Sequence, residues 1–285
     1  MSQQSSSKHS IIIGALSGLL VLSIGVSTLL YFQSKNQLQA INPKKVPKES
    51  NAVQFPSEDT ALKELFFVSD PSGKVKTAPN KLTYFLFEQS FKIGTNNLHV
   101  KFFATQSLDE SGRPFDWHAA GVDVGAITYK QNYSQWEVIS KQPQFGEAGK
   151  WGEFYGGEPE VLQLSPTSLA VMVDHSDFGQ GYSTEGKIVF VFAQNTWHNF
   201  GYIETGGSNP GNCDQTPPPA GEEGLAPCYS YEGEISVVKG STSEYPDLLV
   251  TRTGTESNEY RGTPLPAKNV TYIFKDGRYM NPNEP

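Results

Sequence analysis

The hydrophobic residues of this chain form one long run near the amino terminus and many short runs after residue 60. Residues 11–32 read IIIGALSGLLVLSIGVSTLLYF and contain no charged side chain. At about 1.5 Å per residue, a helix of this length reaches about 33 Å, which is enough to cross the hydrocarbon core of a bilayer. The pattern therefore predicts one transmembrane helix.

The run is typical of an uncleaved anchor rather than a signal peptide. A signal peptide has a basic start, an apolar stretch of about 7–15 residues and a small-residue cleavage site. Here only Lys8 precedes the run, the run is longer, and no Ala-x-Ala pattern follows it. We therefore expect a cytoplasmic tail over residues 1–10, a transmembrane anchor over 11–32 and a polar, proline-containing spacer over 33–60.

Gly14 and Gly18 form a G-x-x-x-G pattern inside the run. This pattern lets two spanning helices approach closely, which would make a homodimer. Glycine is also common in membrane helices for other reasons, and that interpretation is favoured. A homodimer through these two glycines stays the second interpretation.

After residue 60 the apolar runs are four to eight residues long and rich in β-branched and aromatic types. Gly, Pro, Asn or Asp bounds each of them, which is typical of strands. A short helix is predicted over residues 61–67, with Ser57 as its N-cap. The predicted strands are 82–87, 98–104, 122–129, 136–140, 161–164, 169–174, 187–193, 199–204, 235–239, 247–252 and 270–274.

These runs predict one all-β domain over residues 61–285, built as an antiparallel twisted sandwich or a half-open barrel. Three segments share the order strand, polar turn, aromatic residue, and they place Trp136, Trp197 and Tyr279 just after their turns. Asp276-Gly277 is a strong hairpin signal. Such hairpins resemble propeller blades, but their unequal spacing makes a propeller-like arrangement the second choice.

Charge argues against nucleic acid as a partner. The chain has 30 acidic and 22 basic residues and a net charge of −8. An acidic surface repels both nucleic acid and anionic lipid. Lys35, Lys44, Lys45 and Lys48 follow the anchor, and a positive flank favours the cytoplasmic side. Because large domains cross membranes largely regardless of charge, this signal does not decide the orientation.

The two cysteines favour the opposite orientation. Cys213 and Cys228 bracket a loop rich in Pro and Gly, where a disulfide would close about 15 residues. Such a bond persists only in an oxidising compartment. Two thiols alone lack the four ligands of structural zinc. We therefore expect a single-pass protein of the inner (cytoplasmic) membrane with a large extracytoplasmic, periplasmic-type domain.

One polar cluster is a candidate for acid–base chemistry. Asp174, His175 and Asp177 follow an apolar strand and open a glycine-rich segment in which Glu185 also lies. A histidine between carboxylates can act as an acid–base group. However, Asp, Ser and Gly are also the ordinary residues of loops, and the loop interpretation is favoured.

We expect neither a metal nor a cofactor. The motifs of nucleophile elbows, zinc proteases, P-loops, dinucleotide sites and EF-hands do not occur after residue 32. His118, His175 and Asp123 are residue types that bind transition metals, but nothing in their spacing requires them to meet.

The segment 145–160, FGEAGKWGEFYGGEPE, is aromatic, acidic and rich in glycine. Trp151, Phe154 and Tyr155 could stack on a sugar or grip a peptide, or could fold over the core, which is favoured because large rings usually bury themselves. Long loops are often functional, so this segment and residues 206–228 are the first candidates for a partner surface.

Two functions from different classes follow from these features. The favoured one is a membrane-anchored, extracytoplasmic β-rich binding or scaffold protein without catalysis, whose partner is an envelope protein or an envelope polymer. The alternative is an envelope hydrolase or carbohydrate-active enzyme that uses His175 with a nearby carboxylate. An enzyme requires both groups in one concave pocket within hydrogen-bond reach of each other or of one water.

Overall fold

The computed structural model describes residues 54–283, apart from 215–223, 241–242 and 258–262. The chain divides into two units, residues 1–52 and 53–285, and the first lies outside the described residues. The predicted tail, anchor and most of the spacer therefore lie there too, as do Gly14 and Gly18. Within the described ranges, no helix has the length and apolar character needed to cross a membrane.

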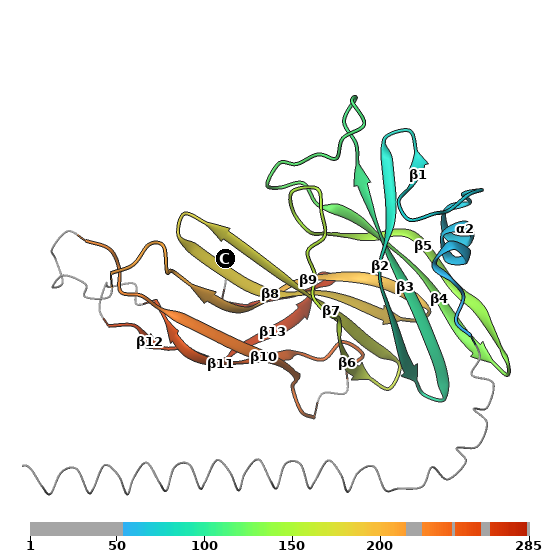
Figure 1. The fold of residues 1–285 in the computed structure, drawn as a ribbon. Coiled ribbons are helices and arrows are strands. Elements are labelled where there is room, and N and C mark those ends of the chain that lie inside the picture. Colours follow the sequence, from blue (N-terminus) through green and yellow to red (C-terminus); the bar gives the residue numbers. More distant parts are fainter. Residues whose placement is uncertain (1–53, 215–223, 241–242, 258–262, 284–285) are drawn as a thin grey trace, which may run out of the picture. The chain divides into compact units, whose positions relative to one another are not determined.

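The second unit is all-β with one short helix, which confirms the predicted fold class (Figure 1). Its first sheet has five strands in the order β1-β2-β3-β4-β5, each antiparallel to its neighbour. Every strand therefore pairs with the next one in the sequence. These strands are β1 (Val75–Ala78), β2 (Lys81–Ile93), β3 (Asn96–Ser107), β4 (Val122–Asn132) and β5 (Gln135–Ala148).

The second sheet has nine strands and curls into a half-barrel, the shape of one of the two predicted alternatives. Its order is β14-β13-β11-β10-β9-β8-β7-β6, with β12 paired to β11. Two large sheets are not the separate blades of a propeller. The strands are β6 (Glu160–Ser165), β7 (Ser168–Gly179), β8 (Tyr182–Ala193), β9 (Thr196–Ser208), β10 (Ser230–Val237), β11 (Leu248–Glu256), β12 (Leu265–Pro266), β13 (Val270–Lys275) and β14 (Arg278–Met280).

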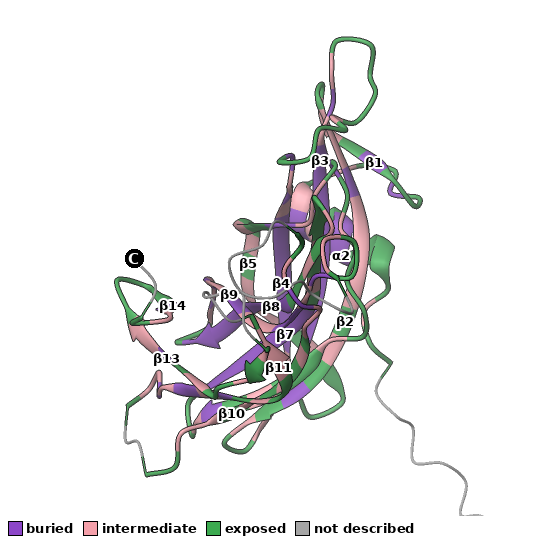
Figure 2. Cartoon of the chain, turned by 90° about the vertical axis from the view of Figure 1, so that its left-hand side faces the viewer, coloured by how far each residue is buried: buried purple, intermediate pink, exposed green. Residues whose placement is uncertain are grey.

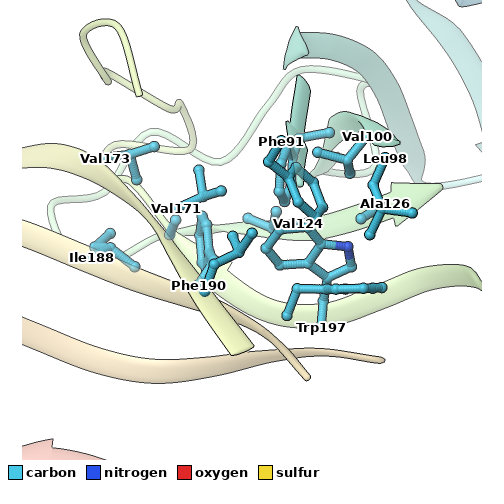
Figure 3. Close-up of a cluster of buried hydrophobic side chains, with 14 residues drawn as sticks. Phe91, Leu98, Val100, Val124, Ala126, Val171, Val173, Ile188, Phe190 and Trp197 are labelled. Carbon is cyan, nitrogen blue, oxygen red and sulfur yellow. The ribbon is translucent and has the colours of Figure 1, made fainter. Parts of the chain in front are cut away.

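The main core lies between the two sheets. Figure 3 shows Phe91 and Val100 of the first sheet gathered with Phe190 and Trp197 of the second. All four side chains are buried, and Trp197 is 1% exposed. Figure 2 shows that buried residues run through the interior of the unit and that exposed ones gather at loops and hairpin ends.

Strands β7 and β8 are buried on both faces. Val171 of β7 faces the first sheet, whereas Met172 belongs to a second core inside the curl of the half-barrel. Because side chains alternate between the faces of a strand, a strand with two buried faces needs a continuous apolar run. The sequences LAVMV and IVFVFA meet this requirement.

Helix α2 (Glu58–Phe66) covers the outer face of the first sheet. The Ser57 side chain accepts a hydrogen bond from the Thr60 backbone N–H, which confirms the predicted N-cap. Leu62 and Leu65 are buried in a third core, where Phe103 also lies. The helix therefore closes the side of the first sheet that the second sheet does not cover.

Candidate functional site

The polar segment that contains His175 is a β-hairpin, and its interpretation as a loop was wrong. Strand β7 continues to Gly179, and β8 begins at Tyr182 after a turn at Gln180 and Gly181. Both turn residues have positive φ, 54° and 85°. Within this hairpin His175 pairs with Gly186, and Asp177 pairs with Thr184.

Strand alternation divides the four predicted acid–base residues into two sets. His175 and Asp177 line one pocket. Asp174, one position from His175, instead forms an ion pair of 2.8 Å with Lys187. Glu185 lies next to Thr184, which lines the pocket, so its side chain points to the other face of the hairpin. The structure therefore brings together His175 and Asp177 but neither Asp174 nor Glu185.

The pocket has a volume of about 380 Å³, which is within the range of small-molecule sites. Strands β7, β8 and β9 supply one part of its wall, and the end of β5 and the following residues supply another. Its polar lining comes chiefly from Glu147, Lys150, His175, Asp177, Thr184 and Tyr202.

The Asp177 carboxylate is held by two cationic or potentially cationic groups. Lys150 Nζ forms an ion pair with Asp177 Oδ2, and His118 Nε2 lies 3.1 Å from Asp177 Oδ1. The hydrogen bond from Lys150 is the main cause that lowers the pKa of the Asp177 carboxyl. Asp177 is therefore a fixed anion that positions Lys150 and His118 at the pocket.

The loop that contains Gly152 packs closely against the loop that contains Phe115 and Ala120, and a glycine makes this close approach possible. The Gly152 backbone N–H donates a hydrogen bond of 2.8 Å to the Ala120 carbonyl. Gly152 has a φ of 69°, and a Cβ at this position would lie 1.8 Å from the Phe115 carbonyl oxygen. Only glycine fits, so Gly152 sets the approach that places His118 near Asp177.

His175 differs from Asp177 because it lacks a strong partner. Its ring packs edge-on against Tyr202, with 5.6 Å between centroids. No hydrogen bond joins its side chain to another described residue. Burial lowers the pKa of His175, and the charge of Lys150 lowers it further. The imidazole is therefore neutral near pH 7 and has no carboxylate to orient it.

An exposed aromatic ring borders this pocket next to Lys150 in the chain. The ring of Trp151 packs edge-on against His118, with 5.0 Å between centroids, and Trp151 is 49% exposed. Trp117 and Tyr155 are also exposed. Phe154, in contrast, packs inward against Phe87 of the main core. Of the three predicted partner-binding residues, Trp151 and Tyr155 thus face solvent and Phe154 does not.

Trp117 was not selected from the sequence, although its neighbour His118 was considered for a metal. The signal was present in Asp116-Trp117-His118, a polar and aromatic tripeptide before a strand. Asp123 is engaged by other residues: its carboxylate forms an ion pair of 2.8 Å with Lys81 and accepts a hydrogen bond from Gln144. In the portion that the structure describes, no group of three His, Cys, Asp or Glu residues could hold a metal ion.

Cys213 and Cys228 form a disulfide with a Cα–Cα distance of 4.8 Å, which confirms the predicted pairing. The buried side chain of Asn209 also holds the base of this loop. Its Oδ1 accepts a hydrogen bond from the Tyr229 backbone N–H at 2.7 Å, and its Nδ2 donates one to the Pro227 carbonyl.

No protein-family model, curated protein or solved structure matches this chain. The chemistry of the pocket and its rim is therefore the basis for a function.

Proposed function

We propose that this chain is a membrane-anchored, extracytoplasmic binding protein of the cell envelope that holds a segment of a saccharide polymer in the pocket beside His175. The observation that carries the proposal is the arrangement of Trp151, His118, Asp177 and Lys150, in which an exposed aromatic ring borders a fixed set of charges. We expect these residues to bind the saccharide without cleaving it.

The pairing of Asp177 favours binding over hydrolysis. A general base needs a free carboxylate or an imidazole oriented by a hydrogen bond. Asp177 is engaged by Lys150 and His118, and His175 has no such hydrogen bond to a described residue. A ligand that enters the pocket therefore meets positioned donors and acceptors but no activated group.

The mixture of rings and polar groups favours a saccharide. An indole ring such as Trp151 offers a flat apolar face, and its neighbours offer hydrogen-bonding groups. Sugar rings present an apolar face and a periphery of hydroxyl groups, so they match both features. Trp117 and Tyr155 are further exposed rings on the segments that carry His118 and Trp151, which suits a chain longer than one sugar.

The extracytoplasmic location is supported by the Cys213–Cys228 disulfide, because such bonds persist in oxidising compartments. The apolar run at residues 11–32 supplies the anchor. A periplasm-active reporter fused to the carboxyl terminus of the full chain tests this location. We expect activity on the outer side of the membrane, and a reporter active only in the cytosol would contradict it.

Binding is tested with the full-length protein in detergent micelles. We would titrate a panel of neutral, amino-sugar and anionic oligosaccharides and measure heat by calorimetry. We expect saturable binding of at least one class, its loss in Trp151→Ala, and its retention in Tyr133→Ala. Tyr133 is the matched control because its ring is 94% exposed at the turn between β4 and β5, whereas the pocket lies at the opposite end of β4.

Hydrolysis is the second candidate because His175 and Asp177 do line the same pocket. It predicts that a bound oligosaccharide is shortened during incubation and that His175→Ala abolishes the shortening. We expect the oligosaccharide to be recovered intact. Cleavage that depends on His175 would replace the binding proposal with the hydrolase.

A further inference from the structure

Strand β2 presents a long free edge. On one side β2 pairs with β3 from Lys81 to Ile93. On the other side it pairs with β1 only at Lys81, Leu82 and Thr83. In the part of the chain that the structure describes, residues 84–93 have no strand on this side. The N–H and C=O groups that such an edge leaves unpaired are a template for another strand. A second strand would displace the Gln89 side-chain amide, which donates a hydrogen bond of 2.8 Å to the Ser90 carbonyl.

The other three sheet edges are protected in ways that β2 is not. Strand β5 contains Pro143, and Gln142 and Asn199 tie it to the second sheet. At the two edges of the second sheet, β6 and β14 are short. Proline, short length and covering contacts are the usual means of blocking edge-to-edge pairing. Residues 84–93 contain no proline and carry several large apolar side chains. The one bulge of β2 lies between Phe85 and Phe87, so residues 87–93 stay in regular register with β3.

The charges along this edge are complementary to themselves. In an antiparallel pair centred on Ser90, Glu88 of each copy lies opposite Lys92 of the other, and this contact forms twice. Both side chains are exposed. The internal contacts of Glu88, with Lys101 and His99, both use Oε2. Its Oε1 is therefore available to a second cation.

Other registers lack this match. A shift by one residue places outward-facing side chains opposite core-facing ones, which turns one sheet over. A symmetric register centred on Glu88 or on Lys92 places like charges directly opposite each other, which is destabilising. The register centred on Ser90 also places Phe87 opposite Ile93, so that apolar residues meet on the core-facing side.

We propose that two copies of this chain associate through antiparallel pairing of their β2 edges, centred on Ser90, to form one sheet that continues across both copies. The pairing is symmetric, as in most homodimers. It uses neither the pocket beside His175 nor the glycines of the apolar run, so it is independent of the proposed function.

A cysteine crosslink tests the register in the full-length protein in detergent micelles. The described cysteines form a disulfide, so Ser90→Cys introduces a single free thiol. Opposite residues of paired strands have Cα atoms about 4.5–5.5 Å apart, which suits a disulfide. We expect mild oxidation to give a covalent dimer on a non-reducing gel for Ser90→Cys and little for Tyr133→Cys, which lies on the turn between β4 and β5.

The control separates this contact from association through the anchor or through micelles, because either of these would crosslink both variants to a similar extent. Equal crosslinking of the two variants, or none at position 90, would overturn the proposal. Lys92→Glu provides a second measurement, since it places a second carboxylate opposite Glu88 in each of the two contacts. We expect at least a fivefold increase in the dimer dissociation constant by sedimentation, and an unchanged constant would also overturn the proposal.

Discussion

The indole Nε1 of Trp197 donates a hydrogen bond of 2.8 Å to the Thr128 hydroxyl, and this contact joins the two sheets at the centre of the main core. Trp197 belongs to β9 and Thr128 to β4, and both side chains are buried. The side-chain amide of Gln142 also bonds to the backbone N–H and C=O of Trp197. These polar contacts therefore fix the position of one sheet on the other, whereas the apolar side chains of the main core provide most of the buried surface area between the sheets.

Thr128→Val should lower the free energy of unfolding by about 1–3 kcal/mol, because it leaves the buried indole N–H of Trp197 without its acceptor. Urea denaturation followed by circular dichroism measures the change. Thr271→Val is the matched control, since Thr271 is exposed on strand β13. A similar loss in both variants would show that the effect belongs to threonine in strands and not to the contact.

Local signals in the sequence predicted the elements well. Every predicted strand coincides wholly or partly with an observed one. The N-cap at Ser57 and the hairpin at Asp276-Gly277 were identified because each depends on a few neighbouring residues, and both turn residues have positive φ. Three observed strands, β1, β12 and β14, were not predicted, because each has only two to four residues and none contains a long apolar run.

Long-range relations could not be read from the same patterns. The apolar runs of β7 and β8 do not reveal which sheet covers which face. The polar end of β7 extends beyond the apolar run that fills the cores, so it lacks the apolar alternation that marks a strand. Once the segment is known to be a strand, alternation explains why His175 and Asp177 share a pocket while Asp174 does not. The proximity of Trp151 to His118 depends on Gly152 and on loop packing, which have no periodic signal.

Lys150→Met should raise the pKa of His175. The charge of Lys150 lowers this pKa, and its removal also leaves the nearby Asp177 anion less neutralised. Titration of the His175 imidazole by NMR measures the shift, which should bring the pKa closer to its usual value of 6.5. Lys187→Met is the control, because Lys187 pairs with Asp174 and Glu160 and not with Asp177. A pKa that moves equally in both variants would contradict the arrangement of charges described for the pocket.

His99 should make the folded chain less stable as the pH falls below its usual pKa of 6.5. The side chain is 2% exposed and stacks on Phe55, and burial lowers its pKa in the folded state. Below pH 6.5 the unfolded chain therefore binds a proton that the folded chain does not, so stability decreases with falling pH until the folded pKa is reached.

His99→Phe removes this proton-binding difference and keeps a ring against Phe55. Urea midpoints measured at about pH 8 and about pH 5 should differ less in this variant than in the wild type. Measurements stop at about pH 5 because at lower pH the protonation of Glu88 would cause a separate loss of stability. Burial raises the pKa of this carboxyl, but Lys101 and His99 outweigh burial and hold it below 4.5, so its contribution is lost only at more acidic pH. An equal pH dependence in the two proteins would contradict the role of His99.

Cys213→Ser should lower the free energy of unfolding by about 3 kcal/mol, because the bond closes a loop with a sequence separation of 15. Asn209 still holds the base of the loop through Tyr229 and Pro227, so the variant should fold and show a lower thermal midpoint rather than general loss of structure. Cys228→Ser removes the same bond and should have the same effect. The double variant should be no less stable than either single one, since the second substitution removes nothing further. Thiol labelling provides the independent measurement. The native wild type should remain unlabelled, and Cys213→Ser should label at Cys228. Complete labelling of the untreated wild type would contradict the disulfide and the oxidising compartment inferred from it.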